Sequence, residues 1–337
     1  MKNSERRMKK IKTMKTSIHK LPLAAALLLS AINYQPSTVF AQGSLTPPGA
    51  PAPTMKTLAQ IEPRTPISSA PFTITTPGSY YLTTNLTVTS GDAITIAANG
   101  VTLDLNGFTI ASTVASAAGN GILINSGLRD LAILNGFIQG GVTNNGSGGY
   151  SGSGFGSGIY GFPQNVRVSG VSVSRCLNYG IYLGTGDSTV VEACTVRTVG
   201  SYGIVASIIK ASVAKDCGGS AIYGYQMADC RGESTGSGYG LYATTALNCY
   251  GSSSSFYGLY ASITAQNCYG YSSSGTGLYA FLVNNCYGQS SSSYGIYAYD
   301  IATGSYGFSS SGTGLRANIA NSCDGTTFVI THPYNMP

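Results

Sequence analysis

The sequence has few charged residues: Asp, Glu, Lys and Arg make up 9% of its 337 residues, whereas about 25% is typical of a soluble domain. The formal net charge of +6 would suit an acidic partner such as nucleic acid. However, residues 1–41 alone hold eight basic residues and one acidic residue. The remaining ten basic and eleven acidic residues nearly cancel, so we expect no nucleic-acid partner.

Long apolar runs are also missing. Residues 21–32 form a run of 12, shorter than the roughly 20 residues that span a bilayer. This run follows a basic N-terminus and precedes Val39-Phe40-Ala41, small residues that suit a signal peptidase. The pattern predicts a Sec signal peptide over residues 1–41 and an exported chain that is secreted, periplasmic or at the cell surface. We expect no transmembrane segment after it.

Histidine and tryptophan are scarce. The sequence has no Trp, and after residue 41 its only histidine is His332, which lies among the last six residues. No nucleophile triad, zinc-ligand spacing, phosphate-binding loop or calcium-binding nonapeptide is present. The sequence therefore predicts neither a metal site nor a cofactor.

What the sequence does contain is a repeat of Gly, Leu or Ile, Tyr and Ala, followed by Cys-Tyr-Gly and a serine-rich stretch. Its C-terminal units are spaced by 18 or 19 residues and start at Gly240, Gly258, Gly277, Gly295 and Gly314. Earlier units start at Gly158, Gly180, Gly203 and Ala221. A unit of this length has no room for a helix together with strands and turns, and its glycines disfavour a helix.

Alternation within a unit predicts which side chains are buried. In Leu241-Tyr242-Ala243 the first and third side chains share one face of a strand, and the tyrosine lies on the other. One such unit cannot bury its apolar face alone, but stacked units can. We therefore predict an all-β, single-stranded right-handed parallel β-helix with about 18–19 residues per C-terminal rung. A left-handed β-helix is excluded because an aliphatic residue does not recur at every sixth position.

Composition divides the chain into segments. Asn-Gly pairs at 106–107 and 135–136 predict corners between apolar strands, because both residue types tolerate positive φ. The expected segments are a Pro-rich lead-in (42–70), a β-helix (71–323) and a C-terminal cap or tail (324–337). Within the β-helix we expect N-terminal coils (71–140), a Gly/Ser-rich loop (140–158) and the regular repeats (158–323).

Three segments carry a resemblance to a known group of proteins. Residues 78–82 (GSYYL), 93–96 (AITI) and 101–108 (VTLDLNGF) resemble the opening coils of bacterial right-handed parallel β-helix proteins of the pectate-lyase-like superfamily. The lead-in and the last residues are similar to those of uncharacterised secreted members. The resemblance implies the fold. Because this superfamily contains lyases, hydrolases, epimerases, phage spikes and adhesins, it implies little about activity.

Enzymes of this superfamily use clustered charges, so the charged residues were placed relative to the cysteines. This places Glu192 beside Lys215, and Asp216 in one column with Asp229, Asn248, Asn267 and Asn285. The catalytic candidates are Lys215, Asp216 and Arg231, in a polar groove with Lys210, Asp229 and Glu233. The alternative is a surface ion pair and an Asp/Asn ladder, each worth well under about 1 kcal/mol. The alternative is favoured because no pair of aspartates recurs within one short segment.

The eight cysteines are predicted to occupy one buried column, in which Ser305 replaces the cysteine of one unit. The column contains Cys176, Cys194, Cys217, Cys230, Cys249, Cys268, Cys286 and Cys323. Side chains of successive rungs point in parallel, a geometry that suits disulfides poorly. The spacing therefore favours free thiols.

Tyrosines form the most distinctive columns. One column begins at Tyr160, is interrupted at Val205, ends at Arg316 and contains the candidate ligand-binding residues Tyr182, Tyr223, Tyr242, Tyr260, Tyr279 and Tyr297. A second column contains Tyr250, Tyr269, Tyr287 and Tyr306. Outward-facing rings could stack on sugars or form a contact surface, or they could only reinforce neighbouring strands.

These observations lead to two hypotheses about function. The first is an exported, non-catalytic β-helix protein that is structural or binds a glycan or a surface protein. The alternative is a polysaccharide lyase or glycoside hydrolase. The sequence leaves the oligomeric state open.

Overall fold

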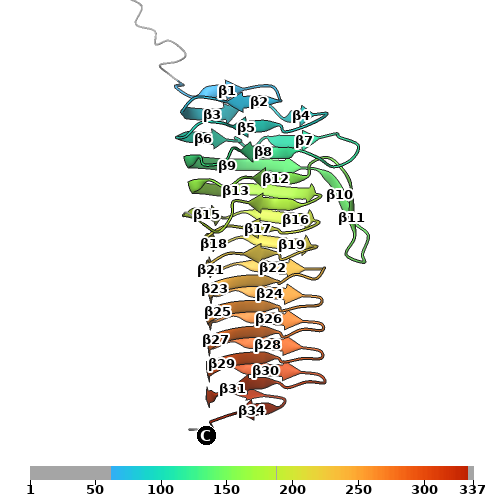
Figure 1. Cartoon of the computed structure of the whole chain (residues 1–337), viewed down its shortest axis with the longest axis vertical. Coiled ribbons are helices and arrows are strands. Elements are labelled where there is room, and N and C mark those ends of the chain that lie inside the picture. The colour runs from blue at the N-terminus through green and yellow to red at the C-terminus, as the bar shows by residue number, and fades with distance from the viewer. Residues whose placement is uncertain (1–61, 187, 333–337) are drawn as a thin grey trace, which may run out of the picture. The chain divides into compact units, whose positions relative to one another are not determined.

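The computed structural model describes residues 62–186 and 188–332, and these residues form a parallel β-solenoid of about 14 turns, here called rungs, without a helix. Figure 1 shows the rungs stacked in chain order from β1 to β34. One sheet of 32 strands contains every strand except the two that form a separate hairpin. No helix in this part of the chain is long and apolar enough to cross a membrane. The predicted signal peptide lies outside the described residues.

The strands pair in three rows that run along the solenoid, each strand with its equivalents in the rungs on either side. Six long strands bend from one row into the next: β9 (Arg129–Gln139), β13 (Gln164–Cys176), β23 (Leu241–Leu247), β25 (Leu259–Gln266), β27 (Leu278–Asn284) and β29 (Ile296–Thr303). All six contribute to row 1, together with β1 (Thr65–Ile67), β3 (Gly78–Leu82), β6 (Val101–Asp104), β15 (Thr189–Glu192), β18 (Ile208–Lys210), β21 (Gln226–Ala228) and β32 (Ile319–Asn321).

The other two rows complete each rung. Row 2 contains parts of β9 and β13 and the strands β4 (Leu86–Val88), β7 (Thr109–Ser112), β16 (Thr195–Val199), β19 (Val213–Cys217), β22 (Arg231–Ser234), β24 (Tyr250–Ser253), β26 (Tyr269–Ser272), β28 (Tyr287–Ser290), β30 (Tyr306–Ser309) and β33 (Asp324–Gly325). Row 3 contains parts of β23, β25, β27 and β29 and the strands β2 (Phe72–Ile74), β5 (Ile94–Ile96), β8 (Asn120–Ile124), β12 (Ser157–Tyr160), β14 (Tyr179–Tyr182), β17 (Ile204–Val205), β20 (Ile222–Tyr223), β31 (Leu315–Ala317) and β34 (Phe328–Ile330).

The core consists of aliphatic columns. The inward column of row 3 is fully buried and contains Ile94, Ile122, Ile159, Ile181, Ile204, Ile222, Leu241, Leu259, Leu278, Ile296 and Leu315. Each side chain stabilises the fold by about 1.5–3 kcal/mol relative to exposure. The predicted alternation is confirmed, because Leu241 and Ala243 are buried and Tyr242 between them is part-exposed.

The inward column of row 2 becomes smaller along the chain. In order it contains Leu86, Ile110, Ile138, Val173, Val196, Ala214, Gly232, Gly251, Gly270, Gly288 and Gly307. A Cβ atom added to Gly251 would lie 2.2 Å from the carbonyl oxygen of Gly258 on the opposite side of the interior. The C-terminal rungs are therefore narrower than the N-terminal ones.

The corner between row 1 and row 2 is made by residues with positive φ. One such residue per rung follows row 1: Asn106, Asn135, Gly170, Ala193, Ala211, Asp229, Asn248, Asn267, Asn285, Gly304 and Ser322. The predicted corners at Asn106 and Asn135 are confirmed, with φ angles of 51° and 52°. Asparagine tolerates this left-handed conformation better than other residues that have a Cβ.

The prediction that all eight cysteines share one column is wrong. Six of them follow the corner between row 1 and row 2, here called the asparagine corner. Cys176 and Cys217 lie instead at the far end of row 2, where they are in register with Val199 in the rung between them and with Ser234 in the rung after Cys217. All eight thiols are free. Burial raises the pKa of Cys176 to about 12 and that of Cys194 to about 11, so both stay protonated at neutral pH.

The cysteines at the asparagine corner have a structural role. The backbone N–H of Cys249 donates to Sγ of Cys268 at 3.5 Å, and that of Cys268 donates to Sγ of Cys286 at 3.4 Å. In the next rung Oγ of Ser305 accepts from the N–H of Cys286 at 3.1 Å. The column therefore satisfies the buried N–H groups of Cys249, Cys268 and Cys286, and serine can replace cysteine as the acceptor.

The segment predicted as a Gly/Ser-rich loop forms an antiparallel hairpin of β10 (Gly141–Asn144) and β11 (Tyr150–Ser153). It projects beside the solenoid in Figure 1. Strands also extend past both predicted limits of the β-helix, because β1 pairs with β3 and β34 pairs with β31.

Candidate functional site

A column of tyrosines follows the outer face of row 3. This tyrosine ladder comprises Tyr160, Tyr182, Tyr223, Tyr242, Tyr260, Tyr279 and Tyr297. From Tyr223 to Tyr297 the rings stack with centroid distances of 4.4, 5.0, 4.8 and 5.2 Å and interplanar angles of 7° or less. The predicted register is thus confirmed, including the interruption by Val205 and the end at Arg316.

A further tyrosine column lies beside the ladder, and the sequence analysis missed it. Its members precede the opening glycine in five of the nine units: Tyr179, Tyr202, Tyr239, Tyr257 and Tyr294. Tyr239 lies edge-on to Tyr242, with a centroid distance of 5.1 Å. Burial raises the pKa of Tyr239 to about 12, and it also raises that of Tyr260. The phenols of Tyr239 and Tyr260 are therefore neutral at physiological pH. The recurring pattern Tyr-Gly-Leu/Ile-Tyr was the available signal in the sequence.

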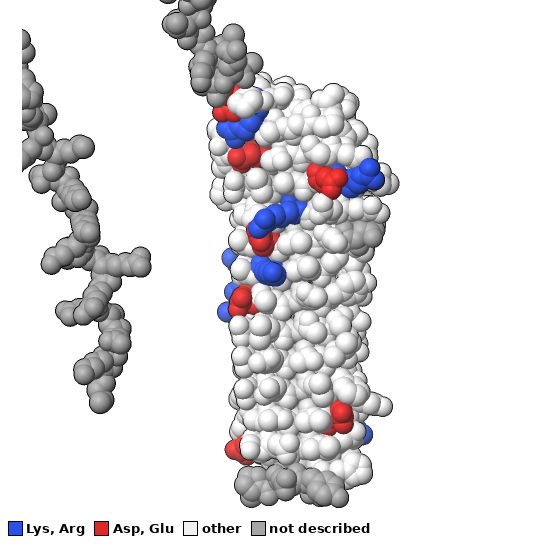
Figure 2. All heavy atoms as spheres, turned by 90° about the vertical axis from the view of Figure 1, so that its left-hand side faces the viewer, with Lys and Arg blue, Asp and Glu red and all other residues white. Residues whose placement is uncertain are grey.

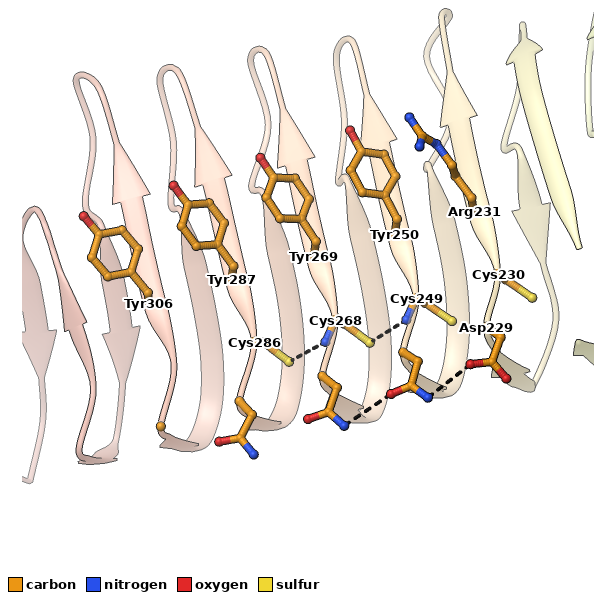
Figure 3. A pocket seen from close by; sticks show the side chains of 14 residues that line it. Asp229, Cys230, Arg231, Cys249, Tyr250, Cys268, Tyr269, Cys286, Tyr287 and Tyr306 are labelled. Atoms are coloured by element: carbon orange, nitrogen blue, oxygen red, sulfur yellow. Dashed lines mark hydrogen bonds between the residues drawn. The ribbon is translucent and has the colours of Figure 1, made fainter. Parts of the chain in front are cut away.

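A groove of about 720 Å³ runs along row 2 beside the asparagine corner (Figure 3). One side is formed by Asp229, Asn248, Asn267, Asn285 and Gly304, and the other by Arg231, Tyr250, Tyr269, Tyr287 and Tyr306. We call it the asparagine–tyrosine groove. Its four tyrosine rings stack at 5.0, 5.0 and 5.2 Å, and the Arg231 guanidinium lies 4.5 Å from the centroid of the Tyr250 ring.

The asparagine side chains of the groove form a hydrogen-bonded chain. Nδ2 of Asn267 donates to Oδ1 of Asn248 at 3.2 Å, and Nδ2 of Asn248 donates to Oδ1 of Asp229 at 3.1 Å. All three residues are exposed, and a primary amide has two N–H donors and two acceptor lone pairs. Hydrogen-bonding capacity beyond that used in the chain is therefore available to a ligand.

The surface around the aromatic rows is almost uncharged. Between residues 234 and 315 the sequence contains one charged residue, Asp300. Figure 2 shows that, on the side it presents, charged side chains gather over the N-terminal rungs, where Arg167 donates from Nε to Glu192 at 2.8 Å. The C-terminal rungs thus offer neutral aromatic and amide groups.

Two of the catalytic candidates, Lys215 and Arg231, form surface ion pairs with the same carboxylate, Glu233. Oε1 of Glu233 lies 3.4 Å from Nζ of Lys215 and 2.6 Å from Nε of Arg231. Lys215 is in register with Arg197, and Glu192 is in register with Lys210, so the predicted stacking of Glu192 on Lys215 is wrong. Glu233 thus offsets the charge of both cations, of which only Arg231 also lines the groove.

Asp216 lies elsewhere, and its predicted position in the Asp229 column is wrong. It occupies the position that Thr198 has in the preceding rung. Its carboxylate accepts hydrogen bonds from Asn144 Nδ2 (2.6 Å), Tyr150 Oη (2.9 Å) and Thr198 Oγ1 (2.8 Å). Burial alone would raise its pKa, but these hydrogen bonds hold the pKa of Asp216 below its usual value. An ionised carboxylate with these partners anchors the hairpin and has no proton to donate.

No group of three or more His, Cys, Asp or Glu residues is placed to hold a metal ion within residues 62–186 and 188–332. No family model and no curated protein matches this chain. The chemistry of its surface must therefore indicate its function. Stacked rings with exposed amides can bind a ligand that has flat apolar faces and hydroxyl groups.

Proposed function

We propose that this chain is an exported, non-catalytic β-helix protein of the pectate-lyase-like superfamily that binds a neutral glycan along its asparagine–tyrosine groove. The opening coils at residues 78–108, together with the β-solenoid, support the superfamily. The observation that carries the function is the groove itself, with four stacked tyrosines facing a row of exposed amides.

The proposal follows from the chemistry of sugars. The C–H faces of a pyranose ring are apolar and pack on aromatic rings, while its hydroxyl groups need donors and acceptors such as amides. Rungs repeat at about 4.8 Å, so a glycan that lies along the groove meets the same pair of groups at successive positions. The scarcity of charge in these rungs favours a neutral chain.

The ion pairs support a non-catalytic role. Lys215 and Arg231 share Glu233, and Asp216 anchors the hairpin. Inside the groove the charged side chains Asp229 and Arg231 lie at one end, away from Tyr269 and Tyr287. General acid and base catalysis by carboxylates needs two of them to converge on one bond, and the lining of the groove contains a single carboxylate, Asp229.

The test is affinity electrophoresis of the purified full chain in gels that contain xylan, glucomannan, soluble β-glucan or polygalacturonate, with assays for new reducing and unsaturated ends. We expect retention by a neutral polysaccharide and no products. The double variant Tyr250→Ala/Tyr269→Ala should lose retention. The control is Phe281→Ala/Tyr299→Ala, which removes a stacked, exposed aromatic pair outside the groove. The polysaccharide should retain this control variant as strongly as the wild-type chain.

Three outcomes would contradict the proposal. Product formation would establish an enzyme, and retention by polygalacturonate alone would show that charge and not stacking governs binding. Retention that survives in the groove variant but is lost in Tyr242→Ala/Tyr260→Ala would move the site to the tyrosine ladder.

A further inference from the structure

The tyrosine ladder has one missing ring. Tyr182 and Tyr223 are both in register with Val205 in the rung between them. Since neighbouring rungs are about 4.8 Å apart, Tyr182 and Tyr223 are two rung spacings apart, and no ladder ring lies between them.

This position is a pocket of about 300 Å³. Its walls are Tyr182, Tyr202 and Tyr223, together with Gly184 and Thr185 from the turn between β14 and β15. Val205, 3% exposed, lines the position that a tyrosine occupies in other rungs.

Tyr202 does not close the gap. Its ring lies 6.3 Å from that of Tyr182 at 74° and 6.1 Å from that of Tyr223 at 84°. These are edge-on contacts, whereas an inserted ring would stack face to face. Tyr202 thus forms a side wall of the pocket and stacks on neither Tyr182 nor Tyr223.

The lining is polar but uncharged. Burial raises the pKa of Tyr182 and that of Tyr223, so their phenols stay protonated. At the rim Oγ1 of Thr185 donates to Oη of Tyr225 at 3.3 Å. Hydroxyl groups and aromatic faces without a charge suit a neutral, hydroxylated ring.

We propose that this pocket binds one terminal neutral pyranose unit of a glycan, stacked in the place of the missing tyrosine. Because Tyr182 and Tyr223 stand at both ends of the gap along the solenoid, a chain end or a side branch fits, and a chain running along the ladder does not. The ligand class rests on the proposed function, but the residues are separate from the asparagine–tyrosine groove.

The test is saturation-transfer NMR of the full chain with the methyl glycosides of glucose, galactose and mannose, and with p-cresol as an aromatic probe. Val205→Tyr supplies the missing ring and completes the stack, so it should preserve folding while reducing transfer to the preferred glycoside at least tenfold. Val205→Ile is the matched control, because it keeps a β-branched side chain and leaves the gap open. It should change transfer by less than twofold.

The outcomes separate this inference from the proposed function. Unchanged glycoside transfer in Val205→Tyr, or no transfer from the wild-type chain, would overturn the pocket even if polysaccharide retention persists. Loss of p-cresol transfer alone would overturn it in favour of a pocket for an aromatic side chain. Val205→Tyr should retain polysaccharide, and Tyr250→Ala/Tyr269→Ala should keep glycoside transfer, so either site can fail while the other stands.

Discussion

The N-terminal and C-terminal rungs use different means of stabilisation. At the same inward position of row 2, Ile138 fills an N-terminal rung, and Gly270 is all that fits in a C-terminal rung. As the interior narrows, apolar side chains move to the outside, where tyrosines stack on one another. The comparison teaches that a solenoid can exchange buried volume for surface stacking while the rung spacing stays the same.

Hydroxyl groups take part in the same exchange. In the rungs of β24, β26, β28 and β30 a buried serine ends the row 2 strand, and its Oγ donates to a carbonyl oxygen of the preceding turn. Ser253 donates to Gly238 at 2.8 Å, and Ser290 donates to Gly275 at 2.7 Å. These hydrogen bonds satisfy the backbone carbonyls of the serine-rich turns. In a wider rung, aliphatic side chains would fill the place that these serines occupy.

The largest expected effect is that of enlarging a narrow rung. A Cβ atom at Gly270 would lie 2.2 Å from the carbonyl oxygen of Gly277, and backbone cannot move aside as a side chain does. We expect Gly270→Val to lower the free energy of unfolding by about 5 kcal/mol or more, measured by denaturant unfolding. If this variant were as stable as the wild type, the narrowing of the core would be refuted.

Emptying a wide rung should have the next largest effect. Ile138 is 1% exposed, and Ile138→Ala should cost about 2–5 kcal/mol through lost burial and a residual cavity. Val196→Ala in the same column removes less volume and serves as a graded control. A cost of Ile138→Ala below that of Val196→Ala would show that the N-terminal rungs do not depend on core volume.

The cysteine column predicts a smaller, chemically specific effect. In Cys268→Ala the buried N–H of Cys249 loses its acceptor, which should cost about 1–3 kcal/mol. Cys268→Ser keeps an acceptor, as Ser305 does in its own rung, and should remain close to the wild type in thermal unfolding. Equal losses in both variants would mean that packing, and not the N–H acceptor, determines the choice of cysteine.

Much of this fold was predictable because short-range periodicity dictates it. Alternation identified the inward Leu241 and the outward Tyr242, and unit spacing gave the register of the ladder, including Val205. Rung-to-rung pairing enforces such a register, since a shift by one residue would turn the whole column inside out.

The register of the charged residues was not predictable from the cysteines. Two corners of a rung place a positive-φ residue before a buried cysteine: Asp216 precedes Cys217 at one, and Asp229 precedes Cys230 at the other. The local pattern is identical, so only the pairing of strands distinguishes them. For this reason Asp216 was assigned to the wrong column, and its contact with a hairpin more than 60 residues away was missed.

The smallest expected effect concerns the junction between wide and narrow rungs. The hairpin reaches Asp216 in one rung and Thr235 in the next, where Tyr150 Oη lies 2.7 Å from Thr235 Oγ1. The pKa of Asp216 is lowered in the folded chain, so its stabilisation is present above the unfolded value of about 3.9 and is lost as the pH falls through the folded value.

We therefore expect Asp216→Asn to lower Tm slightly at pH 7, with the difference from the wild type shrinking as the pH falls below about 4. Asp229→Asn is the control, because asparagine is native to that corner in the next rungs and keeps the acceptor for Asn248. A difference for Asp216→Asn that stays constant between pH 7 and pH 3 would show that the charge of this carboxylate does not hold the hairpin across the junction.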